Sequence, residues 1–169
     1  MSAGATRMHP SAAAFLAMPP ARRREVHLLL CEHALEVWEQ HFPPGDPPSY
    51  VESVVGTRQV LDVGLPREAL DAVRVGRDDA NLDYRYREPI AALQDDDLEF
   101  PDAVEFAYYA IYNAFRRHVQ GADLDDWLIV NQALASVGAE QTLPVLERCV
   151  ETVARAAAAD TGPATSAER

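Results

Sequence analysis

Histidine and cysteine side chains can bind metal ions or act as bases and nucleophiles, and the chain holds one helix-spaced pair of them. His27 and Cys31 stand four residues apart, a spacing that would let two side chains of one helix share a metal. Both also fall on an apolar face, and no second His/Cys pair completes a tetrahedral set. We therefore predict a core histidine and a core thiol, with no metal and no cofactor.

Catalytic groups are not singled out elsewhere in the chain. No serine, threonine or cysteine has a histidine at a spacing that would indicate a catalytic pair. The 8 glycines form no phosphate-binding loop. Cys31 and Cys149 lie far apart in helical patterns, which favours two reduced, buried thiols over a disulfide. We predict that the protein is not an enzyme. A metal- or small-molecule-dependent helical enzyme that uses His27, Cys31 and nearby carboxylates stays an open alternative.

Acidic residues are concentrated in one part of the chain. Residues 95–126 contain nine acidic residues and two arginines, a net charge of −7 out of −12 for the whole chain. Such a tract can be a solvated loop with acids at helix N-termini, or a docking face for a cationic protein. A calcium loop is disfavoured, because DDDLEFPD lacks the alternating ligands and the central glycine of that motif. The acidic residues are Asp95, Asp96, Asp97, Glu99, Asp102, Glu105, Asp123, Asp125 and Asp126.

A polar aromatic stripe is expected beside this tract. It is spaced i, i+4, i+7 and i+11 along a predicted helix and consists of Glu105, Tyr109, Tyr112 and Arg116. Tyrosine and arginine are enriched at binding hot spots, although amphipathic packing would produce the same pattern. We predict a partner-binding site made of acids and this stripe: Asp95, Asp96, Asp97, Glu99, Glu105, Tyr109, Tyr112 and Arg116.

Length and composition limit the class of protein. A chain of 169 residues, 48% hydrophobic and 25% charged, can bury one core without disulfides or a structural metal. The net charge of −12 argues against binding to nucleic acid or to an anionic membrane, and favours a basic partner. All 15 basic residues are arginines, which is typical of a GC-rich bacterial genome. No apolar run reaches the roughly 18 residues of a spanning helix, and residues 11–18 are too short for an export signal, so we expect a cytoplasmic protein.

Helical periodicity predicts an all-α, single-domain bundle of six or seven helices at residues 19–157, between flexible ends at 1–18 and 158–169. Pro101 begins the clearest helix, which carries acids in its first turns and basic residues at its end. Asp123 is predicted to cap the next helix and Gly138 to end it. The expected helices cover about 21–42, 50–61, 65–75, 88–93, 101–119, 124–137 and 142–157.

The stretch REPIAALQDDDLEFPDAVEFAYYAIYNAFRRHV, continued by LDDWLIVNQAL, joins an acidic loop to a Tyr-rich helix. Over about Tyr84 to Leu134 the chain thereby resembles small all-α bacterial immunity proteins that are encoded beside polymorphic toxins. The resemblance assigns no catalytic or binding residue. It implies stoichiometric, non-catalytic occlusion of a cognate toxin, and a basic toxin such as a nuclease would complement the acidic tract. A helical scaffold or a dimeric interaction protein is a further alternative.

Overall fold

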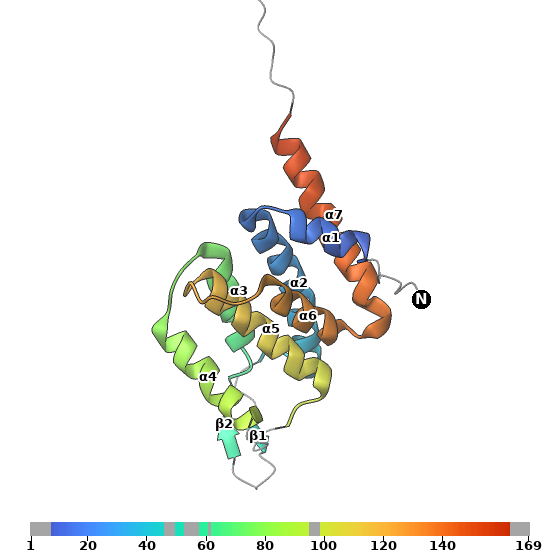
Figure 1. Ribbon diagram of the computed structural model, residues 1–169. Helices are drawn as coiled ribbons and strands as arrows, with labels where there is room; N and C mark the ends of the chain where they lie inside the picture. The colour runs from blue at the N-terminus through green and yellow to red at the C-terminus, as the bar shows by residue number, and fades with distance from the viewer. Residues whose placement is uncertain (1–7, 46–49, 53–57, 61, 95–98, 163–169) are drawn as a thin grey trace, which may run out of the picture.

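Residues 8–45, 50–52, 58–60, 62–94 and 99–162 are described by the computed structural model of the chain. Within these ranges lie seven helices and one two-stranded antiparallel ladder (Figure 1), so the predicted all-α fold of six or seven helices is confirmed. None of the described helices is long and apolar enough to cross a membrane. The elements are α1 (Pro10–Ala17), α2 (Pro20–His41), β1 (Tyr50–Glu52), β2 (Arg58–Val60), α3 (Leu65–Val75), α4 (Ala80–Gln94), α5 (Asp102–His118), α6 (Asp126–Val137) and α7 (Ala139–Asp160).

The central helix of the bundle is α5, which packs against α2, α3 and α6 (Figure 1). Its buried side chains recur at helical spacing, and Tyr108, Ile111 and Phe115 have no exposed surface. The small side chain of Ala110 lets α2 come close, so that the Cys31 Sγ lies 3.8 Å from the Ala110 carbonyl oxygen. The predicted helix over 101–119 is therefore confirmed as the core of the fold.

A second apolar cluster joins α1, α6 and α7 to α2. Helices α6 and α7 contribute eight of its twelve buried residues, and Leu143 of α7 is exposed. The cluster is lined by Phe15, Val26, Leu30, Ala110, Val130, Ala133, Leu134, Val145, Leu146, Cys149, Val150 and Val153. Its side chains cover the face of α2 that the first cluster leaves open, which closes the bundle around α2.

The first helix corrects the prediction that residues 1–18 are flexible. Residues 10–17 form α1, which begins at Pro10, and the His9 Nδ1 accepts a 3.2 Å hydrogen bond from the Ser11 amide. Phe15 is fully buried, with its ring centre 5.6 Å from that of His27 and 5.8 Å from that of Trp127. Burial of this aromatic side chain stabilises the short helix, because packing against the rest of the protein provides most of the stability of a helix. Residues 1–7 lie outside the described residues.

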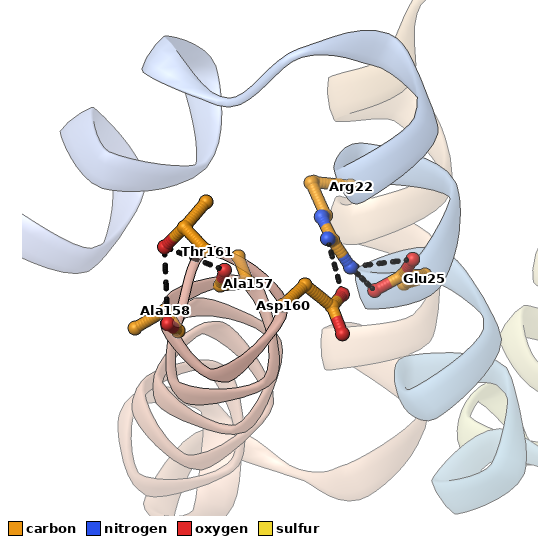
Figure 2. Close-up of polar contacts among 6 residues, drawn as sticks. All are labelled: Arg22, Glu25, Ala157, Ala158, Asp160 and Thr161. Carbon is orange, nitrogen blue, oxygen red and sulfur yellow. Dashed lines mark hydrogen bonds and ion pairs between the residues drawn. The ribbon is translucent and has the colours of Figure 1, made fainter. Parts of the chain in front are cut away.

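The last helix extends beyond its predicted end at 157 and finishes at Asp160. An Asp160 carboxylate oxygen lies 2.8 Å from an Arg22 guanidinium nitrogen near the start of α2, and Glu25 binds the same guanidinium at 3.0 Å (Figure 2). The Thr161 hydroxyl donates to the Ala158 carbonyl oxygen at 3.0 Å. The Arg22–Asp160 contact attaches the end of α7 to the start of α2. Residues 163–169 of the predicted flexible tail lie outside the described residues.

The expected helix over 50–61 is wrong. Residues of this segment form β1 and β2, which pair antiparallel with Tyr50 opposite Val60 and Glu52 opposite Arg58. The segment holds four valines and a threonine, whose branched Cβ atoms favour strands over helices.

Helix α4 begins at Ala80, eight residues before the predicted start near Glu88. The Asp79 Oδ1 accepts hydrogen bonds from the amides of Asn81 and Leu82, at 3.0 and 3.1 Å, and so caps the first turn. Pro89 lies inside the helix, where it removes one backbone hydrogen bond. Pro89 is buried, and so are Tyr86 and Ile90 of the same helix.

Candidate functional site

The predicted partner-binding acids that the structure describes lie around the start of α5. Glu99 and Asp102 are exposed, and Glu105 is half-buried. Asp102 and Glu105 occupy the first turns of the helix, where the helix dipole stabilises negative charge. Asp95, Asp96 and Asp97 lie outside the described residues.

An exposed aromatic side chain that was not predicted lies among these acids. Phe106 is 40% exposed and follows Asp102 by four residues, while Tyr109 follows Phe106 by three. Residues three or four apart share a helix face, so the Phe106 ring lies on the same face as the Asp102 carboxylate and the Tyr109 ring. We call this the α5 face: Glu99, Asp102, Glu105, Phe106 and Tyr109. Phe106 was not predicted as a surface residue because only polar and charged side chains of this helix were considered for the binding site.

Tyr109 is the half-buried tyrosine of the α5 face. Burial, reinforced by the charge of Glu105, raises the pKa of Tyr109 to about 12. The phenol is therefore neutral at physiological pH and keeps its O–H donor. This combination of a partly exposed ring and a polar tip suits a contact with another protein.

The predicted surface stripe is wrong at Tyr112, which lies in the core at 7% exposure. Its hydroxyl donates to the Asp83 Oδ1 of α4 at 2.9 Å, and Arg87 also pairs with Asp83. Arg116 is half-buried, with its guanidinium carbon 5.7 Å from the centre of the Tyr112 ring. Asp83 lies in the first turn of α4, so this early part of the helix covers that side of α5. Tyr112 and Arg116 are thus separated from the α5 face.

The acidic tract is also not one continuous surface. Helix α5 has 17 residues, and at 1.5 Å per residue it separates Asp102 from the second group of acids by about 25 Å. In that second group, Asp125 caps α6 by accepting a 2.9 Å hydrogen bond from the Trp127 amide. The cap is therefore Asp125 and not Asp123, which is exposed.

Asp126 is the buried member of the second group. Its carboxylate lies 2.7 Å from an Arg23 nitrogen and 2.5 Å from the Arg117 Nε. Arg117 also donates to the Leu124 carbonyl oxygen. Asp126 therefore stabilises the junction of α2, α5 and α6 instead of adding to an exposed negative surface.

Most arginines of the described residues are bound to carboxylates. Glu99, Asp102 and Asp123 have no such partner among the described side chains. Much of the positive charge of the described surface is therefore neutralised, and Glu99 and Asp102 give the start of α5 a negative field. The arginines in ion pairs are Arg22, Arg23, Arg67, Arg74, Arg85, Arg87, Arg117 and Arg155.

Two histidines form a second cluster of titratable groups beside Asp126. The His27 Nε2 lies 2.8 Å from the Asp126 backbone oxygen, and the His27 Nδ1 lies 2.8 Å from the His118 Nε2. Burial lowers the pKa of both imidazoles to about 4, so both are neutral at physiological pH. Both nitrogens of His27 are occupied, which confirms the prediction of a core histidine. The cluster was not predicted, since 91 positions separate the two residues.

A pocket of about 290 Å³ lies beside this pair, between the start of α2, the end of α5 and the loop before α6. Arg117, His118, Asp123 and Asp126 contribute to its wall. The pocket combines a neutral imidazole with one exposed carboxylate, which makes it a candidate for binding a polar group.

The two cysteines are free and buried, which confirms the predicted thiols. Burial raises the pKa of Cys31 to about 12 and that of Cys149 to about 11. Both sulfurs are therefore protonated at physiological pH and are weak nucleophiles.

Comparison with protein-family models, with curated proteins and with solved structures gave no match for this chain.

Proposed function

We propose that this protein binds a basic protein partner through the α5 face and neutralises it, in the manner of an immunity protein that occludes a toxin. One observation carries this proposal. Two exposed acids without an ion-pair partner among the described residues, Glu99 and Asp102, lie at the start of α5, and Asp102 shares a helix face with the exposed ring of Phe106. An aromatic anchor within a charged rim is the arrangement that binding hot spots use.

Charge gives the proposed surface its selectivity for basic proteins. The chain carries a net charge of −12, and most of its described arginines form ion pairs with carboxylates of the same chain. A field of this sign accelerates encounter with a cationic surface and disfavours acidic partners. The segment 95–97 adds three aspartates directly before the α5 face in the sequence.

Neutralisation would follow from the position of the acids. A toxin that acts on nucleic acid needs a basic surface to hold its substrate. Carboxylates that occupy that surface would compete with phosphates for the same arginines and lysines. The proposed activity is thus stoichiometric and needs no chemical step by this chain.

The proposal is tested with the protein encoded immediately upstream of this chain's gene. Co-expression should relieve the growth defect that the upstream protein causes, and the two proteins should purify as a stable complex. The absence of a complex with that protein and of growth rescue would contradict the proposal.

A matched pair of charge reversals tests the surface itself. Asp102→Arg should slow association about threefold to tenfold at low salt, and the difference should shrink as salt screens the charges. Asp78→Arg is the control, because Asp78 is also exposed but precedes α4, whose Asp83 contacts the other half of α5. Equal association rates for the two variants would exclude the α5 face as the docking surface.

A further inference from the structure

A groove of about 530 Å³ lies between α1, the start of α2 and the end of α7. Seven of its nine lining residues are apolar, and four of these are alanines: Ala14 and Ala17 of α1, and Ala154 and Ala157 of α7. None of the nine lining residues is acidic. The wall therefore suits contact with apolar side chains of another molecule.

The two polar residues of the groove wall are already bonded within the chain (Figure 2). The Arg22 guanidinium lies 2.8 Å from an Asp160 carboxylate oxygen and 3.0 Å from one of Glu25. The Thr161 hydroxyl donates to the Ala158 carbonyl oxygen at 3.0 Å. A charged or hydrogen-bonding ligand would therefore gain little in this groove.

Helix α1 presents an uncharged outer surface beside the groove. Its sequence PSAAAFLA contains no charged residue, and only two of its eight residues are buried. Leu16 is 45% exposed. At about 3.6 residues per turn, Leu16 and Ala14 lie on nearly opposite sides of the helix, and the exposed Ala13 and Ala17 lie between them. We call Ala13, Leu16, Ala17 and the groove the α1 face.

The α1 face is complementary to itself. In a two-fold dimer, the same patch is used on both copies, and a feature on one side of the axis contacts a feature on the other side. Leu16 lies on one side of α1, and the groove that Ala14 lines lies on the other. A two-fold axis that runs along α1 past Ala13 and Ala17 would place the Leu16 of each copy over the groove of the other. The small alanines at the axis would let the two helices approach closely.

Charge favours a second copy of the chain at this face. The first 24 residues contain four arginines and no acidic residue, in a chain with a net charge of −12. Two copies with that charge repel one another, and the repulsion is weakest where acids are lacking. A basic protein would instead find no acidic residue in the groove wall.

We propose that the protein forms a two-fold dimer through the α1 face, with Leu16 of each copy in the groove of the other. The eight residues of α1 span about 12 Å, so the face covers on the order of 300–500 Å² per copy. Stable complexes bury about 800 Å² per partner. The dimer is therefore weak and reversible.

The dimer goes beyond the proposed function and does not depend on it. Figure 1 shows α1 and the end of α7 near the top of the view, and the start of α5 lies well below them. Dimerisation through the α1 face thus leaves both α5 faces free for a partner.

Sedimentation velocity of the full chain over about 5–500 μM tests the proposal. We expect a monomer–dimer equilibrium with a Kd on the order of 10–100 μM. An increase of NaCl from about 50 to 500 mM should lower that Kd about threefold to tenfold, because salt screens the repulsion between the two negative copies. Binding of a basic partner to the α5 face should weaken under the same change.

Two variants connect the dimer to the α1 face. Leu16→Glu places a carboxylate in the apolar groove, and Ala13→Glu places one carboxylate of each copy beside the axis. Each should raise the Kd at least about tenfold. Both residues are exposed, so the fold should persist, and circular dichroism checks it. Leu128→Glu is the matched control on α6, where the side chain is 38% exposed, and should leave the Kd unchanged.

Four results would overturn the inference. They are a monomer at every concentration, a dimer that both α1 variants retain, an equal loss of dimer in Leu128→Glu, and a monomer that binds phosphatidylcholine vesicles instead of itself. A failed capture of the upstream protein would count against the proposed function alone, since the dimer is measured without it.

Discussion

Tyr86 of α4 and Tyr108 of α5 each donate a hydrogen bond from the phenol to the other residue's backbone carbonyl oxygen. The two bonds measure 2.8 and 3.2 Å, and the ring centres lie 4.2 Å apart. Burial raises the pKa of both phenols well above the usual value, so neither ionises in the folded protein. This reciprocal pair attaches α4 to the central helix through long side chains.

Removal of either phenol hydroxyl should loosen that attachment. Tyr86→Phe and Tyr108→Phe each keep the ring and lose one buried hydrogen bond, so each should lower the free energy of unfolding by about 1 kcal/mol. Urea unfolding monitored by circular dichroism measures the change. Tyr109→Phe is the control, because that hydroxyl is half-exposed and should contribute less. A similar loss in all three variants would show that the reciprocal bonds have no special role.

Stability should depend on pH through His27 and His118. Their folded pKa values of about 4 lie below the usual 6.5, so the unfolded chain binds more protons at intermediate pH. Stability from this pair is fully present above pH 6.5, falls as the pH drops towards 4, and the total loss is on the order of 2–4 kcal/mol. Urea unfolding at several pH values measures the slope.

A histidine variant tests whether these two residues cause the change of stability with pH. His27→Gln keeps a donor and an acceptor but removes one titrating group, so its stability should change less between pH 6.5 and 5. The neighbouring charges of Arg23, Arg24, Arg117 and Asp126 stay in place in both proteins. An unchanged slope, or an NMR pKa of His27 near 6.5, would contradict this account.

Asp126 should be far more important for stability than its neighbour Asp125. Asp126→Asn leaves two partly buried arginines without their shared carboxylate, and we expect a loss of about 2–3 kcal/mol. Asp125→Asn should cost less than about 0.5 kcal/mol, because asparagine also caps helices well. Thermal unfolding of the two variants at neutral pH makes the comparison, and equal losses would refute the difference.

The elements that were predicted correctly carry strong local signals. α3 ends at Gly76, which adopts a left-handed φ of 69°, and α5 follows directly after Pro101. Such residues act within one turn of the chain, so their effect can be predicted from the sequence alone. The strands between 50 and 60 were missed because valine-rich segments satisfy both helical and strand patterns over so short a length.

The candidate site could be predicted only in part, because periodicity places a residue on a helix but does not place helices in space. Tyr112 was expected at the surface, and the position of α4 buries it against Asp83. His27 and His118 meet although 91 positions separate them. The acids at the start of α5 were found because their exposure depends mainly on the helix they belong to.

Phe106 should be important for binding and unimportant for folding. Phe106→Ala should weaken binding to the basic partner about tenfold or more, because the ring is the apolar centre of the α5 face. Since the side chain is already 40% exposed, the free energy of unfolding should change by less than about 1 kcal/mol. Leu128→Ala is a matched control, since Leu128 is 38% exposed and lies at the start of α6, beyond the other end of α5. Calorimetric titration of the complex measures both affinities. If Leu128→Ala weakened binding as much as Phe106→Ala, the apolar anchor would have to lie elsewhere, and the acids at the start of α5 would act by long-range attraction alone.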